Sequence, residues 1–460
     1  MFLVRPSHRN HNRNLSASAR NIKQAMHQVL AQEDLKPRHV AGSAPGIDVQ
    51  RITEFGTSRQ VETLVVDWSQ DEISCHVVTN NALADLLKEP RPAHSKVRWI
   101  NCSGLSFDVL KVLAIHFEMH PLAVEDVLHL PQRIKADFFP QHTYISMLLP
   151  LLLPPNLEAE DNTNSLPPLF TGHHILLQQT TTLTPTELEF LQRPDVHLEE
   201  CSIFLLPDNT ILSLFQQSGR KVTDKILEVL HGAPHATTAS PSSPQPLSQI
   251  LFTLQASANP TRLTALRRAE DTGLLLHALA DGIVDTYFSI VELYETQIAH
   301  TQDLVLTRPR SAYVKTLYLM RKEVSCLRRA LHPTESLVLH LRDRTTQLSE
   351  TCRTYFGDVL DHVLTVMEDL GAMEVTTEGL IDLTFNTMSF QTNENMKLLS
   401  VVSAVFLPIS FVAGVYGTNF DYFPELHLDI GIFYFYIWTV AIIIVAIAIS
   451  KRMGMLENLQ

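Results

Sequence analysis

Cysteine is scarce in this sequence, and no CxxC pair occurs. The five cysteines are scattered along the chain and odd in number, which argues against a disulfide framework or a zinc cluster and favours a reducing compartment. No GxxxxGK[ST] loop and no nucleophile–base pairing or metal-ligand cluster stands out, so we expect no use of ATP, no organic cofactor and no enzymatic activity. Basic residues are also outnumbered. The net charge of −13 disfavours nucleic acid as a partner and would attract free cations.

Charge is missing altogether from two runs near the C-terminus, Leu398 to Phe420 and Ile430 to Ser450. Each run is long enough to cross a hydrocarbon core as a helix, which takes about 20 residues. Helices of this length in soluble proteins keep a polar face, so we expect a membrane protein whose partner here is the lipid bilayer.

Flanking charge predicts the orientation of these two spans. Lys397 precedes the first span, and Lys451 and Arg452 follow the second. The connector holds Asp421, Glu425 and Asp429 but no Lys or Arg. By the positive-inside rule, we expect a multi-pass protein of the inner or plasma membrane, with both chain ends cytoplasmic and the connector outside.

The remaining sequence predicts an α+β organisation with a cytoplasmic α/β domain. Strands are expected at "QVETLVVDW", "KVRWINCSG", "HTYISMLLPLLL", "GHHILLQQ" and "CSIFLLPDNTILSLFQ", with a hairpin turn at "DNT". Helices are expected at "SFDVLKVLAIHF" and "HPLAVEDVLHL". The predicted division is a flexible basic segment at 1–60, the α/β domain at 61–250, a helical stalk at 251–396, two transmembrane helices with a short outer loop at 397–452, and a cytoplasmic tail at 453–460.

Long helices dominate the predicted stalk. One is expected to run to about Thr307 and stop at "RPRS", and a second to about Leu331, stopping at "HP". No proline occurs between Pro333 and Pro408. This gap predicts a single helix of about 80 residues, roughly 120 Å long, that begins in the cytoplasm and ends as the first span.

One face of the first span collects small and polar residues at steps of three and four. Such a face is typical of a pore wall, but it also fits plain helix–helix packing, since small residues let helices approach closely. Two spans cannot enclose a conduit, so a pore requires an oligomer around an axis. The face consists of Asn393, Met396, Leu399 with Ser400, Ser403, Leu407, Ser410, Gly414 and Gly417.

The outer acids Asp421, Glu425 and Asp429 would repeat in each subunit of such an oligomer. A ring of these loops would concentrate cations at the mouth of the pore. The alternative is that the three acids only keep a short loop solvated.

Several segments together resemble the CorA family of divalent-cation channels. They are "HPLAVEDVLHLPQR", "YFGDVLDH" and the run from "LIDLTFNTMSF" to "GVYGTNFDYFPEL". The order of segments is also similar. The family signature at the end of the first span is Gly-Met-Asn, and here it is Gly417, Thr418 and Asn419.

The resemblance implies a homopentamer with a funnel-shaped cytoplasmic part and one central pore. Asn419 would form the first selectivity element, a ring of amides that hydrogen-bonds the waters of a hydrated ion, which suits Mg²⁺ because it gives up water reluctantly. The resemblance places lower rings at Asn393, Leu399 and Leu407, with an acidic ring at Asp382.

The resemblance also implies a regulatory magnesium site between subunits. Asp358 would face Glu125 and Asp126 of a neighbour, and Asp224 is a weaker candidate. A bound cation would relieve the repulsion among these acids and favour a closed state. The alternative is that each acid is a surface residue or a helix cap.

Three functions follow. The first is influx of Mg²⁺, with Co²⁺ and Ni²⁺, down the electrochemical gradient and gated by intracellular Mg²⁺; a divalent ion gains about 4.6 kcal/mol per 100 mV. The second is a zinc transporter of the same fold, coupled to protons. No ionisable residue lies inside either span to relay protons, which weakens this alternative. The third is a membrane-anchored binding protein, against which the polar face argues.

Overall fold

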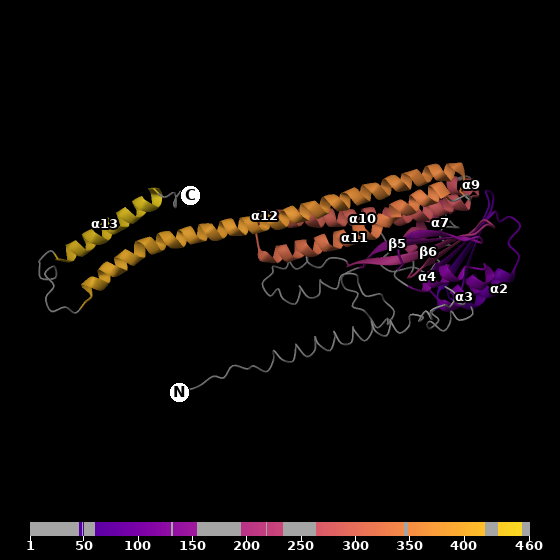
Figure 1. Cartoon of the computed structure of the whole chain (residues 1–460), viewed down its shortest axis with the longest axis horizontal. Helices are drawn as coiled ribbons and strands as arrows, with labels where there is room; N and C mark the ends of the chain where they lie inside the picture. Colours follow the sequence, from indigo (N-terminus) through magenta and orange to yellow (C-terminus); the bar gives the residue numbers. More distant parts are fainter. Residues whose placement is uncertain are drawn as a thin grey trace, which may run out of the picture. The chain divides into compact units, whose positions relative to one another are not determined.

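A seven-stranded sheet and a set of long helices make up the computed structural model of the protein (Figure 1). Its residues fall into two compact units. The first holds residues up to Leu293 together with Glu323–Gly371, and the second holds Tyr294–Lys322 together with the residues from Ala372 onward. These units divide three long helices, so the domain boundaries expected from the sequence stay predictions. The residues that the structure describes are 46–47, 49, 60–129, 132–153, 195–217, 219–232, 264–344, 348–418 and 431–452.

The sheet has the order β2-β1-β3-β7-β6-β5-β4. Its neighbouring strands are antiparallel except for β3 and β7, which pair in parallel. The turn between β6 and β7 places Asn209 at a φ of 57°, a conformation that asparagine tolerates well. The strands are β1 (Glu62–Trp68), β2 (Ile73–Val78), β3 (Val97–Ser103), β4 (Lys135–Phe138), β5 (Thr143–Leu153), β6 (Asp195–Leu205) and β7 (Thr210–Phe215).

A buried ion pair fixes the register of β1 on β3. Asp67 lies directly opposite Arg98 in this antiparallel pair. The guanidinium donates from Nε and Nη2 to the two carboxylate oxygens, each at 2.9 Å, and Ser95 Oγ donates to the same carboxylate at 2.7 Å. A slip of one residue would move every side chain to the other face and would leave the buried carboxylate without its partner, so this pair opposes a change of register.

Three short helices cover one face of the sheet. They are α2 (Asn80–Lys88), α3 (Phe107–His116) and α4 (Pro121–Leu128). Their apolar side chains share one buried cluster with Val65 and Ile100 of the strands. The expected helices at "SFDVLKVLAIHF" and "HPLAVEDVLHL" are confirmed as α3 and α4.

Other helices pack against the sheet through α10 (Thr272–Thr307). Tyr287 of α10 donates its hydroxyl to the carbonyl of Leu148 in β5 at 3.1 Å. The helix α7 (Arg220–His231) lies against α10 where Val222 contacts Gly282, and a Cβ at that glycine would come within 2.9 Å of the valine. The short helix α9 (Ala265–Ala269) precedes α10, and its Arg267 donates to the carbonyl of Ser69.

The remaining helices are α11 (Ser311–Arg344), α12 (Glu350–Tyr416) and α13 (Gly431–Arg452). The predicted end of the first long helix at Thr307 is confirmed by α10. In the second unit, α13 contacts α12 through the rings of Tyr416 and Phe435, whose centroids lie 5.4 Å apart.

Two helix boundaries expected from the sequence are wrong. The second helix does not stop near Leu331, because α11 continues through Pro333 to Arg344, and the next helix has 67 residues rather than about 80. A proline inside a helix costs about 3 kcal/mol. Burial of Leu337, Val338 and Leu341 beyond it outweighs this, at about 1.5–3 kcal/mol for each side chain. The actual start of α12 is capped by Ser349, whose hydroxyl accepts from Cys352 N at 3.3 Å.

The predicted strands and the hairpin at "DNT" are confirmed where the structure describes them, whereas "GHHILLQQ" lies outside the described residues. The patterns did not predict β2, α2 or β4. The two strands lack a clear alternating pattern because β4 is a short, charged edge strand of mostly intermediate burial and β2 is also mostly half-buried.

His142 is a buried histidine beside the sheet. Its ring is 1 % exposed and lies near Phe139 and Phe204, and neither ring nitrogen has a hydrogen-bond partner within the described part of the chain. Burial, with a smaller effect of the charge on His120, lowers the pKa of His142 from 6.5 to about 4. The folded chain therefore holds this imidazole neutral.

We expect acid to destabilise the fold through His142. The unfolded chain binds a proton at a higher pH than the folded chain does, so stability is lost as the pH falls from about 6.5 towards 4, by roughly 2 kcal/mol at about pH 5. His142→Phe should therefore show a smaller drop in Tm between neutral pH and about pH 5 than the wild type does. An equal drop in both proteins, measured by scanning calorimetry, would show that His142 does not set the acid response.

Candidate functional site

The polar face of α12 is preserved by a continuous helix. At 3.6 residues per turn, Asp382, Asn393, Leu399, Ser403, Leu407 and Ser410 fall within about a third of the helix circumference. Most of this face is accessible in the single chain: Leu399 is 66 % and Leu407 is 69 % exposed. A lining role for these residues stays a prediction, but α12 does place them on one face.

The C-terminal end of α12 is closed by two residues of the predicted signature. Gly417 N donates to Ala413 O at 3.0 Å, and Thr418 N donates to Val415 O at 3.2 Å. The Thr418 hydroxyl donates to the same Val415 carbonyl at 2.7 Å. Threonine thus satisfies a carbonyl that the last helical turn leaves free. Asn419, Asp421, Glu425 and Asp429 lie outside the described residues.

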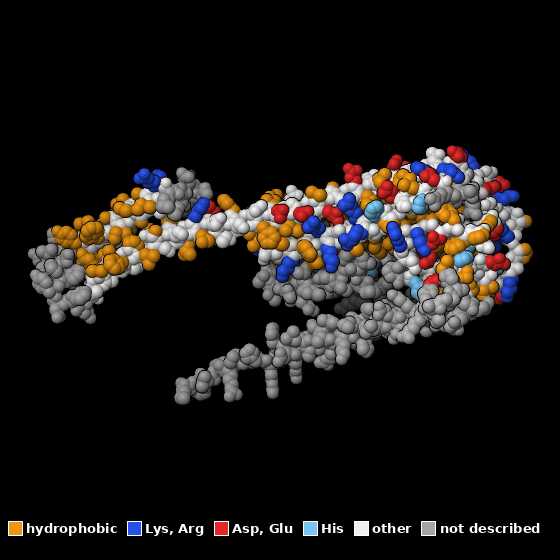
Figure 2. All heavy atoms as spheres, viewed as in Figure 1, with side chains coloured by type: hydrophobic (Ala, Val, Ile, Leu, Met, Phe, Trp, Pro, Cys, Tyr) orange, Lys and Arg blue, Asp and Glu red, His pale blue; other side chains and the backbone are white. Residues whose placement is uncertain are grey.

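Three helices in the described part of the chain are long and apolar enough to cross a membrane: α10, α12 and α13. Half of the apolar window of α10 is buried inside the protein, against none in α12 and 6 % in α13. The apolar side chains of α10 therefore pack against the rest of the first unit. Figure 2 shows hydrophobic side chains gathered over α13 and the end of α12.

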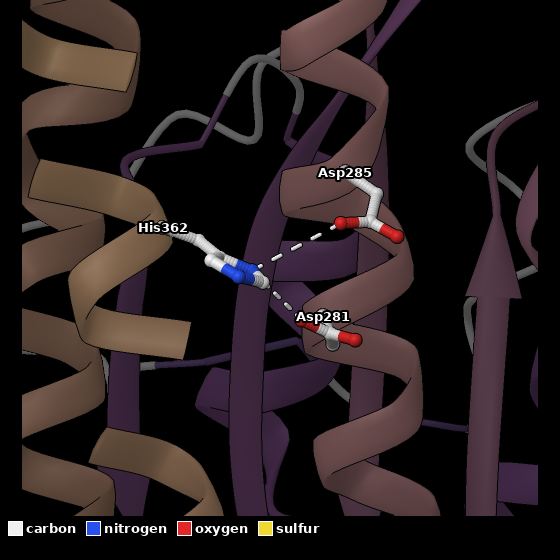
Figure 3. A group of neighbouring side chains, drawn as sticks. All are labelled: Asp281, Asp285 and His362. Carbon is white, nitrogen blue, oxygen red and sulfur yellow. Dashed lines mark ion pairs between the residues drawn. The ribbon is translucent and has the colours of Figure 1, made fainter. Parts of the chain in front are cut away.

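A second candidate site lies in the first unit, where α10 and α12 bring together Asp281, Asp285 and His362 (Figure 3). The His362 imidazole points between the two carboxylates. Its Nδ1 lies 3.2 Å from Asp281 Oδ1 and 4.0 Å from Asp285 Oδ1. One ligand atom from each residue lies within 4.8 Å of the others, which is a spacing that a single divalent cation could bridge.

The surroundings of this metal centre are crowded with acids. Burial and the neighbouring charge of Asp281 raise the pKa of Asp285, and Asp358 adds to this, while Lys225 and His362 oppose it. Burial also lowers the pKa of the nearby His277, although Asp281 and Asp358 act against that shift. A divalent cation would relieve the repulsion that these carboxylates exert on one another.

The donor set suits a divalent metal ion. Carboxylates are preferred by Mg²⁺ and Mn²⁺, and imidazole suits Zn²⁺, Co²⁺ and Ni²⁺. Three protein ligands would leave the other coordination positions to water, as Mg²⁺ usually requires. Asp281, Asp285 and His362 therefore offer donors that a divalent cation between α10 and α12 would fit.

The grouping of Asp281, Asp285 and His362, which we call the metal centre as a candidate cation site, was not predicted from the sequence, although a signal was present. Asp281 and Asp285 stand four positions apart, so they lie on one helix face within a largely apolar segment. His362 ends the quoted segment "YFGDVLDH". Nothing in the sequence alone showed that the two segments would pack together.

The predicted sensor acids on α4 have partners within their own chain. Asp126 Oδ2 lies 2.7 Å from Lys135 Nζ, which also contacts Asp137 at 2.8 Å. Burial opposes the charged form of Lys135, but its hydrogen bonds to Asp126 and Asp137 outweigh this and raise its pKa. Glu125 lies 3.7 Å from His129, one turn along the helix. The lysine therefore occupies the position where a cation would contact Asp126.

Asp358 and Asp224 differ from these acids in their surroundings. Asp358 is exposed on α12, close enough to His277 and Asp285 to influence both. Asp224 lies on α7, and burial raises its pKa to about 6, with Arg220 opposing and Glu228 adding to the shift. Asp224 is not among the residues that form the metal centre.

The segments that hold the polar face of α12 and the metal centre match a known protein family. A sequence model described as "CorA-like Mg2+ transporter protein" matches residues 177–451, which include both candidate sites and both uncharged runs. The chain belongs to this CorA-like family. The resemblance in the sequence is thereby confirmed, and at this level the protein is a CorA-family divalent-cation transporter.

Individual relatives in the CorA-like family extend the match. A cobalt/magnesium transport protein CorA from Thermotoga maritima is 25 % identical over 331 residues, which is 71 % of this chain and 74 % of that protein. A zinc transport protein ZntB from Photorhabdus laumondii is 24 % identical over 36 % of this chain and 51 % of its own length. The complete structure of the CorA magnesium transporter from Methanocaldococcus jannaschii has a TM-score of 0.55 at 16 % identity, covering 85 % of this chain and 97 % of that one. This structure supports the CorA fold.

Removing the lysine that pairs with Asp126 tests whether it occupies a cation position. In Lys135→Met, Asp126 and Asp137 would lose their shared counter-ion and repel each other. Millimolar MgCl₂ should then raise the Tm of the variant more than it raises the Tm of the wild type, because an added cation stabilises the state that binds it. Lys96→Met, at an exposed position, is the control. Equal Mg²⁺-dependent shifts in all three proteins would contradict the idea.

Proposed function

We propose that this protein is a Mg²⁺ channel that also passes Co²⁺ and Ni²⁺ and is gated by intracellular Mg²⁺. The observation that carries the proposal is the uncharged end of α12, which is unburied in the single chain and bears small and polar residues on one face. A family match that includes this segment supports it. Passive influx needs no further energy source, since a divalent ion gains about 4.6 kcal/mol per 100 mV of inside-negative potential.

The pore requires several copies of the chain. Two candidate spans cannot surround a conduit, whereas copies of α12 around an axis would turn each polar position into a ring. The proposed assembly is a homopentamer in which Asn393, Leu399 and Leu407 form successive rings. Rings of leucine would close by excluding water, and amide rings would hydrogen-bond the waters of a hydrated cation.

The proposed topology has two spans, α12 and α13, with both chain ends in the cytoplasm. Lys397 precedes the first span, and Lys451 and Arg452 at the end of α13 are exposed. Positive charge on the flanks of both helices supports this orientation. The outer connector then carries Asp421, Glu425 and Asp429 at the mouth of the pore, where negative charge raises the local cation concentration.

Asn419 is proposed as the selectivity residue. Asn419→Ala should abolish Mg²⁺ uptake into proteoliposomes, because no other amide stands at the outer end of the polar face. The oligomer, measured by light scattering, should persist. Thr418→Met is the matched control at the adjacent position. It removes the hydroxyl bond to Val415, worth about 1 kcal/mol, and should keep transport. Normal uptake by the Asn419 variant would refute the assignment.

Regulation is proposed to act at the metal centre of Asp281, Asp285 and His362, together with the neighbouring Asp358. A cation would bind more tightly to the conformational state that brings these ligands together. By linkage, it would stabilise that state. Because α12 also carries the polar face, a cation held on α12 acts on the same helix that lines the proposed pore. A regulatory contact of Asp358 with Glu125 and Asp126 of a neighbour is a further part of this proposal.

Neutral variants of the two aspartates test this regulation. Asp281→Asn with Asp285→Asn keeps side-chain size but removes both negative charges. We expect the concentration of internal Mg²⁺ that half-inhibits uptake to rise about tenfold or more, which corresponds to a loss of about 1.4 kcal/mol of coupling. Asp303→Asn, an exposed acid on the same helix, should leave inhibition unchanged. An unchanged inhibition curve in the double variant would exclude the centre from gating.

A zinc transporter is the second candidate function. The imidazole of His362 in the metal centre favours it, since imidazole suits Zn²⁺ better than Mg²⁺, and a match to a zinc transport protein supports it. Uptake of Mg²⁺, Co²⁺, Ni²⁺ and Zn²⁺ into the same proteoliposomes under an imposed voltage distinguishes the two. Transport of Zn²⁺ without Mg²⁺ would favour the second function.

A further inference from the structure

The connection between α10 and α11 is strongly basic in a chain that is acidic overall. Between Gln302 and Lys322 the sequence holds five basic residues and one acid, Asp303, while the whole chain carries a net charge of −13. All of these residues belong to the second compact unit, which also contains both candidate spans. We name the segment Leu306–Lys315 the basic tip.

The positive charges of the basic tip are accessible. Arg308 and Lys315 are exposed, and neither forms an ion pair within the described part of the chain. Leu306 beside them is 60 % exposed. Figure 2 shows Lys and Arg side chains along α11. An exposed leucine among lysine and arginine side chains is a combination that suits the interface of a membrane.

An ion pair between α11 and α12 shows which part of α12 lies beside the basic tip. Arg321 of α11 lies 3.1 Å from Glu378 of α12. The chain runs from the tip up α11 to Arg321, and along α12 from Glu378 to Lys397 at the start of the uncharged run. With a rise of 1.5 Å per residue in each helix, residue 310 at the near end of the tip lies about 12 Å short of Lys397, and Lys315 lies about 20 Å short of it.

At the near end of the tip this separation is short enough for contact with lipid headgroups, and the long side chain of Lys315 extends from a position farther away. The headgroup layer on each side of a bilayer is about 5–8 Å thick, and the Debye length at physiological ionic strength is about 8 Å. Long Arg and Lys side chains extend outwards from the helix ends. The burial of α12 agrees with this position of the tip. Thr384 is the last buried residue of α12 before its uncharged run, so the packing of other helices on α12 ends near this level.

We propose that the basic tip binds the headgroups of anionic lipids in the cytoplasmic leaflet. Each Lys or Arg near such a surface is attracted to it, and Arg308 and Lys315 are available for this contact. The proposal rests on the two-span topology of the proposed function but on no step of ion transport. Lipid bound at the tip would hold the α10–α11 connection at the membrane beside Lys397.

The rate of cleavage by trypsin at the basic tip tests this contact directly. Trypsin does not cut before proline, so Arg308 is protected by Pro309, whereas the bonds after Arg310 and Lys315 are cleavable. The full chain is placed in nanodiscs of phosphatidylcholine alone or of phosphatidylcholine mixed with phosphatidylglycerol. Cleavage after Lys88, an exposed residue at the end of α2, gives the internal reference rate.

The expected result is that phosphatidylglycerol slows cleavage at the tip several-fold relative to cleavage after Lys88, and that high salt removes the difference. An unchanged ratio in the two lipids would overturn the proposal. Protection that is equally strong in pure phosphatidylcholine would also overturn it, because it would indicate a cover that needs no anionic lipid, such as a second copy of the chain.

Charge-neutral variants give an independent test. In Arg308→Gln with Lys315→Gln, the rise in Tm that phosphatidylglycerol gives the wild type should be lost. Lys88→Gln with Lys96→Gln removes the same charge from exposed positions of the first unit and should keep that rise. Equal rises in both variants would contradict binding at the tip. None of these residues belongs to the polar face or the metal centre, so a failure here leaves the proposed channel standing.

Discussion

A backbone that enters hydrocarbon must satisfy its own hydrogen bonds, because no water is available there. The uncharged end of α12 meets this constraint by continuing a helix that starts at Glu350. The constraint reaches beyond the membrane, since a helix fixes the angular position of every side chain it carries. The polar residues from Asn393 to Ser410 therefore keep a fixed angular order around α12. Where the last turn ends, the backbone N–H and the hydroxyl of Thr418 both donate to the carbonyl of Val415.

Apolar composition alone does not separate a membrane span from a packed helix. α10 and α12 both pass a hydropathy test, yet half of the apolar window of α10 is buried against protein and none of that of α12 is. Tyr287 shows what α10 does instead, because it binds the backbone of β5. Two acids on α10 would be costly in hydrocarbon, whereas in the first unit Asp281 and Asp285 face His362.

The sequence predicted the parts of this protein that depend on local pattern. The alternation of β1 and β3, the helical spacing of α3 and α4, and the end of α10 before Pro309 all follow from neighbouring residues. Pro333 misled the prediction because its local cost is outweighed by burial of Leu337 and Leu341, which depends on tertiary packing. The grouping of Asp281 with His362 was not predicted for a similar reason, since the two residues are far apart in sequence. The pairing of Asp126 with Lys135 likewise depends on how β4 is placed beside α4.

The parallel pairing of β3 with β7 has a consequence for synthesis. The sheet cannot be completed until Phe215 has left the ribosome, but Leu398, where the first uncharged run begins, follows much later. At roughly 5–20 residues per second, the interval is about 10 to 40 seconds. The sheet, with its buried Asp67–Arg98 pair, is thus synthesised well before the two candidate spans of the proposed topology, α12 and α13. In the proposed topology, the residues of the sheet can therefore begin to fold before either candidate span is complete.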